Sequence, residues 1–187
     1  MADVRITKFE NFPMLGDLSV NGLQAGGNLN LHYVYVPGSI SFNSVQFHYE
    51  LTMTSGTRTV SVSFALYSLT GSTWSLANSA STGLTFSTNA SSWWTMETSA
   101  TQDITPGDWM FGMARSRDGG GGVGAEGFVC NSHNGAGEGA YGGPAFRGVY
   151  NSTTNAMPGS MHTSRIAKES STGNTGDLLH PYIVISA

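Results

Sequence analysis

Five histidines are the side chains best suited to metal binding or acid–base chemistry in this chain, and they are scattered along it. Zinc sites draw their ligands from short, fixed spacings, and neither an HExxH motif nor a close histidine pair is present. His133 stands beside Cys130 and Glu138, but no third group can be named that would orient it as a catalytic base. The sequence therefore predicts solvated or hydrogen-bonded histidines, with no metal site and no catalytic residue. The five are His32, His48, His133, His162 and His180.

A glycine run at residues 119–124 matches the dinucleotide-binding pattern GxGxxG. In that motif the first amides of a following helix hold the pyrophosphate, and no helical pattern opens after this run. Asp103 and Asp108 flank a turn, where aspartate ordinarily bonds the local backbone. No second acidic pair suggests glycoside hydrolysis. We therefore expect no cofactor and no enzymatic activity.

Four tryptophans could form a stacking platform for carbohydrate if they were exposed. In alternating strands such residues are more often part of the core. Successive side chains of a strand point to opposite faces, so Trp93 is expected outside if Trp94 and Met96 point inward. The four are Trp74, Trp93, Trp94 and Trp109.

Composition favours one globular domain with an unusually uncharged surface. A chain of 187 residues is long enough for one sizeable core. Only 11% of its residues are charged, against about a quarter in typical soluble domains. Hydroxyl and amide groups must then form much of the surface, which suits contact with neighbouring subunits because few ions need be desolvated. The net charge of −4 and the presence of just two lysines argue against nucleic-acid binding.

The single cysteine, Cys130, excludes an intrachain disulfide, so packing must hold the fold. The first residues have no apolar core of signal-peptide length, and no apolar run approaches the span of a bilayer. We expect a soluble, non-secreted chain that does not enter a membrane.

The segment 58–80 reads as a β-hairpin around which the other elements pack. Val60, Val62, Phe64 and Leu66 alternate with small residues, which is the two-residue period of a strand with one buried face. A glycine-containing turn at 69–72 follows, and the alternation then resumes.

Further short strands are expected at 29–36, 47–53 and 109–113, with a terminal strand at 182–185. Turns rich in glycine, proline and asparagine separate such strands, and no apolar helical repeat is apparent. The pattern predicts an all-β protein, a single antiparallel β-sandwich over residues 29–187.

Two segments depart from the alternation. Residues 1–28 read as an extended N-terminal arm that docks on the domain or on a neighbour, or else as a disordered tail. Residues 115–148 are dominated by glycine and read as a loop excursion, either an interaction loop or a flexible one. The candidate contact residues in these segments and on the sandwich are Phe9, Phe12, Met14, Leu15, Trp93, Phe128, Tyr141 and Phe146.

The block from Val60 to Ser116 contains LYSLTGSTWSLANS, then SWW, then DITPGDWMFG, and it is followed later by GVYNSTTNAMPGSM and a terminal PYIVIS. This arrangement of turns and aromatic residues resembles β-sandwich modules in virion structural proteins of tailed bacteriophages, including jelly-roll head-decoration proteins and tail-fibre tips. The resemblance covers about two thirds of the chain, and the glycine-rich region departs from it.

The resemblance implies a homotrimeric jelly roll on the virion exterior, made in the host cytoplasm. A decoration or cement protein would bind the major capsid protein and sister copies and so stabilise the head shell. The alternative is a tail-fibre or receptor-binding tip, which would hold a carbohydrate. The chain begins at Met1 without coiled-coil heptads or shaft repeats, which favours the capsid.

Overall fold

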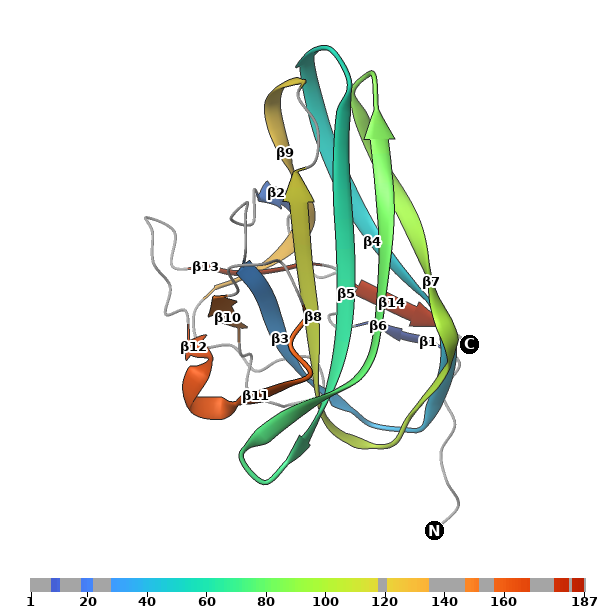
Figure 1. Cartoon of the computed structure of the whole chain (residues 1–187), viewed down its shortest axis with the longest axis vertical. Helices are drawn as coiled ribbons and strands as arrows, with labels where there is room; N and C mark the ends of the chain where they lie inside the picture. The colour runs from blue at the N-terminus through green and yellow to red at the C-terminus, as the bar shows by residue number, and fades with distance from the viewer. Residues whose placement is uncertain are drawn as a thin grey trace.

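The chain folds as two antiparallel β-sheets that pack face to face (Figure 1). The computed structural model describes residues 8–10, 18–21, 28–117, 121–134, 147–151, 157–168, 177–181 and 183–186. Strands dominate these ranges, and their only helical element is one 3₁₀ turn, η2 (Thr163–Arg165). No helix in the described ranges is long and apolar enough to cross a membrane. The predicted all-β sandwich is confirmed.

Within the described residues each sheet has seven strands. The first sheet contains β1 (Lys8–Glu10), β14 (Ile183–Ser186), β4 (Ile40–Ser55), β9 (Gly122–Asn134) and β13 (Asp177–Pro181), with β2 (Leu18–Asn21) paired to β9 and β7 (Ala90–Ile104) paired to β4. The second sheet runs in the order β11 (Ser160–His162), β6 (Thr73–Phe86), β5 (Arg58–Thr70), β8 (Gly107–Arg117), β3 (Asn28–Val36), β10 (Arg147–Asn151) and β12 (Ala167–Lys168).

The main strand pairs are nested in the sequence. The hairpin β5–β6 is innermost, and β4–β7, β3–β8 and β2–β9 enclose it in turn. Successive pairs alternate between the two sheets, so the chain crosses from one sheet to the other at each step. Lateral pairing of β4 with β9 and of β5 with β8 then joins the pairs within each sheet.

The main core lies between the sheets and consists of the inward-facing residues of their strands. On β5 the alternation predicted from the sequence holds, because Val60, Val62, Phe64 and Leu66 are all fully buried. Phe47 and Phe128 meet them from β4 and β9 of the facing sheet. Burial of these aliphatic and aromatic side chains is the main stabilising contribution to the fold.

A second apolar cluster lies on the outward face of the β5–β8 sheet. Ala65 and Tyr67 of β5 and Trp74 of β6 are buried there beneath Met161 and Ile166. Residues 157–168 thus cover part of this face, which Figure 1 shows as β11, η2 and β12 beside the long strands. The sheet is therefore buried on both faces at this place, whereas the sequence pattern predicted one buried face.

The expectation of a loop over 115–148 is wrong for most of its first half. Strand β8 continues to Arg117, and β9 occupies Gly122–Asn134 and pairs with β4. Strand β9 approaches β4 closely at its first residue, where a Cβ on Gly122 would lie 2.3 Å from Thr54 Oγ1. Without side chains at these positions the alternation of β9 is hard to see in the sequence. Residues 118–120 and 135–146 lie outside the described residues.

The N-terminal arm is partly placed. Strand β1 pairs with β14, and β2 pairs with β9, so these two short segments dock on the domain as one of the two alternatives predicted. Residues 1–7, 11–17 and 22–27 lie outside the described residues.

Candidate functional site

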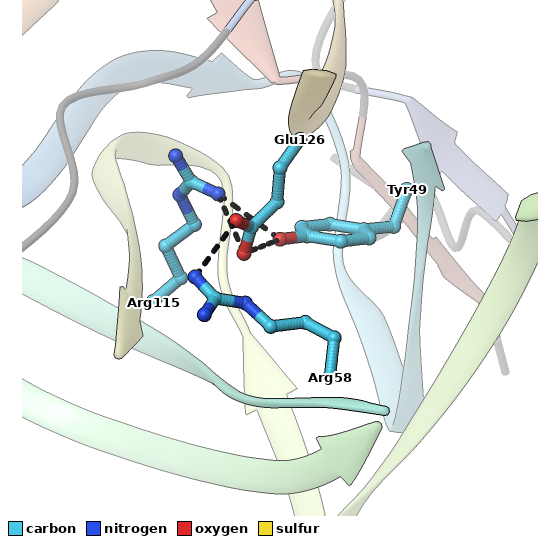
Figure 2. Close-up of polar contacts among 4 residues, drawn as sticks. All are labelled: Tyr49, Arg58, Arg115 and Glu126. Carbon is cyan, nitrogen blue, oxygen red and sulfur yellow. Dashed lines mark hydrogen bonds and ion pairs between the residues drawn. The ribbon is translucent and has the colours of Figure 1, made fainter. Parts of the chain in front are cut away.

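A buried cluster of charged side chains joins the two sheets near the β4–β5 turn (Figure 2). Arg58 at the start of β5 and Arg115 on β8 reach Glu126 of β9 from the opposite sheet. Each guanidinium nitrogen lies 3.1 Å from a different carboxylate oxygen, Arg58 Nη2 from Oε2 and Arg115 Nη1 from Oε1. The exposed fraction of the three residues is at most 7%.

Tyr49 of β4 completes this cluster. Its hydroxyl donates to Glu126 Oε1 over 3.0 Å and accepts from Arg115 Nη1 over 3.1 Å. Burial raises the pKa of the Tyr49 hydroxyl above its ordinary value, against the opposing effect of the Arg115 charge. The tyrosine therefore stays a neutral donor to the carboxylate.

The cluster of Tyr49, Arg58, Arg115 and Glu126 fits a structural role rather than a catalytic one. Both carboxylate oxygens of Glu126 are engaged, and the four residues sit in the core with little exposure. A buried guanidinium group is tolerated only when it is paired with a negative charge. The ion pairs of Arg58 and Arg115 with Glu126 therefore hold the two sheets in one relative position.

Sequence reasoning missed this cluster, although a signal was present. Arg58 and Arg115 occupy inward positions of their strands, in phase with Val60 and Met113, where an apolar side chain is expected. A charge in the inward phase of an alternating strand predicts a buried partner of opposite sign.

The three histidines whose side chains are described, His32, His48 and His162, lie on different elements. Within the described part of the chain no three His, Cys, Asp or Glu side chains form a possible metal site. His32 is buried in β3, His48 lies on the outward face of β4, and His162 caps η2. The side chains of His133 and His180 lie outside the described features.

His162 lies beside Ser72 and Ser164, an arrangement that resembles a nucleophile and base. Its Nδ1 accepts the backbone N–H of Ser164 over 3.2 Å and lies 2.8 Å from Ser164 Oγ. Its Nε2 lies 2.9 Å from Ser72 Oγ. These contacts join the turn of the β5–β6 hairpin to residues 160–166.

The tryptophans are distributed as the alternation predicted and do not form one platform. Trp74 and Trp109 are buried, and Trp94 packs against the main core together with Met96. Trp93 points outward with 46% of its surface exposed.

The other candidate contact residues include one that is buried in the core and several whose side chains are not described. Phe128 is a core residue, only 1% exposed, with its ring edge-on to Phe47 and Tyr49, so it offers no surface for a partner. Phe9 lies in β1 opposite Ile185 of β14, and its side chain is not among the described features. Five candidates lie outside the described residues: Phe12, Met14, Leu15, Tyr141 and Phe146.

A hollow of about 460 Å³ opens where β6 meets a bulge in β7. In this bulge the register with β4 shifts between Phe42 and Ser44, and Thr98 Oγ1 lies 2.7 Å from the carbonyl oxygen of Ala100. The lining is mainly hydroxyl, with one carboxylate and one thioether: Ser63, Ser79, Ser81, Thr98, Glu97 and Met157.

Comparison with known proteins finds no family model that matches the chain and no curated protein significantly similar to it. The fold and the surface of the described residues are therefore the features from which function can be inferred.

Proposed function

We propose that this chain is a non-enzymatic structural protein of a tailed-bacteriophage virion that decorates the capsid exterior. In this proposal it binds the major capsid protein and its own sister copies, as a homotrimer, and stabilises the shell. Its likeness over residues 60–116 to virion β-sandwich modules is one support.

The nested strand pairing is a second support. A jelly roll requires nested strand pairs that alternate between two sheets, and the pairs β5–β6, β4–β7, β3–β8 and β2–β9 support this proposal. Jelly rolls form viral capsid domains and lectin domains, among others. Because one fold can serve several functions, the fold alone does not identify the function, and the properties of the surface are needed to choose among them.

The observation that carries the proposal is the uncharged surface of β5, β6 and β7. Between Thr59 and Gln102 the only charged side chain is Glu97. Outward positions are hydroxyls instead, for example Ser79 and Ser81 of β6, which are exposed. A surface of this kind can be buried against another subunit without desolvating ions, which lowers the cost of assembly.

The test is occupancy on capsid shells that lack the protein. Ser81→Lys places a charge in the hydroxyl surface, and we expect it to weaken shell binding about tenfold or more, since an unpaired charge must then be desolvated. Thr105→Lys, at an exposed position in the β7–β8 turn, is the matched control and should bind as the parent does. Occupancy is read by quantitative gel analysis of purified particles.

Labelling of intact virions with an antibody against this protein gives the location. Label over the head supports the proposal. Label at the tail tip contradicts the capsid role. Equal shell binding by the Ser81→Lys and parent proteins contradicts the assignment of the hydroxyl surface as the shell contact.

A further inference from the structure

The outward face of β4 and β7 carries an exposed indole with polar side chains on both sides of it. The strands pair antiparallel, so opposed residues share this face. Three consecutive outward pairs form the row: Glu50 with Ser91, His48 with Trp93, and Gln46 with Thr95.

Trp93 occupies the centre of the row and packs against His48. Its ring and that of His48 meet edge to face, with centroids 5.4 Å apart and planes at 83°. Burial lowers the pKa of His48, so its imidazole is neutral near pH 7 and adds no positive charge to this face. Nearly half of the indole nevertheless remains exposed to solvent.

Polar groups follow on either side of Trp93 at one strand repeat, about 7 Å away along β7. Ser91 Oγ donates to Glu50 Oε2 over 3.3 Å, which leaves acceptor capacity on the carboxylate. On the other side Thr95 is exposed and Gln46 is half-buried. Donors and acceptors thus flank an apolar ring on the outward face of the sheet.

We infer that this face is a saccharide-binding site, in which a neutral pyranose stacks on Trp93 and hydrogen-bonds to Glu50 and Ser91. A sugar ring has an apolar C–H face and a rim of hydroxyl groups, and this row has the matching arrangement. The sole charge of the row is the Glu50 carboxylate, which accepts from sugar hydroxyls and repels acidic sugars. The preferred ligands are therefore neutral hexoses or N-acetylhexosamines.

A protein partner is the competing occupant, since exposed tryptophans are common in protein interfaces. The saccharide fits better because Glu50 needs no cation from a sugar, whereas burial of this carboxylate under a protein would require one. The inference goes beyond capsid decoration, and either can fail without the other.

The experiment screens the full-length chain on an array of neutral hexose and N-acetylhexosamine oligosaccharides beside sialylated and uronic-acid ones. We expect binding to neutral glycans only. Trp93→Ala should weaken that binding at least about tenfold, because stacking and apolar burial are lost. Tyr35→Ala removes an aromatic residue of similar exposure, 40%, from the other sheet and is the matched control.

Glu50→Gln tests the charge. It should weaken binding to neutral glycans less than Trp93→Ala does and relax the exclusion of acidic ones. Equal melting temperatures of all variants establish that the fold is intact. An array without neutral-glycan binding overturns the inference, as does equal loss with Tyr35→Ala. Reduced shell occupancy of Trp93→Ala together with a blank array assigns this face to a protein partner instead.

Discussion

Replacement of Glu126 by glutamine tests the role of the buried charged cluster directly. The change keeps the size of the side chain but removes the negative charge that Arg58 and Arg115 both contact. Two guanidinium cations then remain in the core without this carboxylate. Removing one partner of a buried ion pair costs about 3–5 kcal/mol, and the two cations place this variant at the upper part of that range.

The structure also predicts an order among the variants. Arg58→Met leaves Glu126 paired with Arg115 and balances the charges, so it should cost less than Glu126→Gln. Arg115→Met should cost more than Arg58→Met, because Arg115 contacts Tyr49 as well as the carboxylate. Replacement of all three charged residues by apolar ones of similar volume should recover much of the loss.

Thermal and urea unfolding followed by circular dichroism measure these differences. For a chain of this length each kcal/mol shifts the melting temperature by about 2–4 °C, so Glu126→Gln should lower it by about 8–20 °C. Glu97→Gln, at an exposed position of β7, is the control and should change stability by less than about 0.5 kcal/mol. A loss below about 1 kcal/mol for Glu126→Gln would refute the reasoning, since the cluster would then contribute no more than a surface pair.

Three further predictions concern glycine positions and pH. Gly121→Ala should lower the free energy of unfolding in urea by about 1–3 kcal/mol, because its Cβ would lie 2.9 Å from two backbone carbonyl oxygens of the β4–β5 turn. At Gly83 a Cβ would meet nothing within 4 Å, so Gly83→Ala is the control and should be neutral or stabilising. Burial and the hydrogen bond to Asp108 raise the pKa of Tyr33 to about 12. The contribution of Tyr33 to folding stability is therefore complete below pH 10 and is lost as the pH rises through 12. In thermal melts between about pH 9 and 12, Tyr33→Phe should reduce this loss of stability. Burial lowers the pKa of His48 in the folded state. Its contribution to folding stability is therefore present above pH 6.5 and is lost as the pH falls through the folded-state pKa. A His48→Gln variant whose melting temperature drops as much as that of the parent between about pH 7 and 5 would contradict this.

The sequence by itself determined the fold class and the direction of many side chains. Alternation along β5 identified the buried residues from Val60 to Leu66, and the glycine turn set the β5–β6 hairpin. The adjacent tryptophans could be told apart because successive residues of a strand face opposite sides, so Trp93 was placed outside and Trp94 inside. These features depend on local geometry, which a single strand already contains.

Tertiary structure alone decided the features that depend on partners distant in the chain. Glycines hid the alternation of β9 in the sequence, and the strand is recognised only through its pairing with β4. Glu126 meets Arg58 and Arg115 because nested pairing brings β9, β5 and β8 to one end of the sandwich. Trp93 acquires its polar neighbours from β4, more than forty residues earlier in the chain, through a strand register that no local pattern encodes.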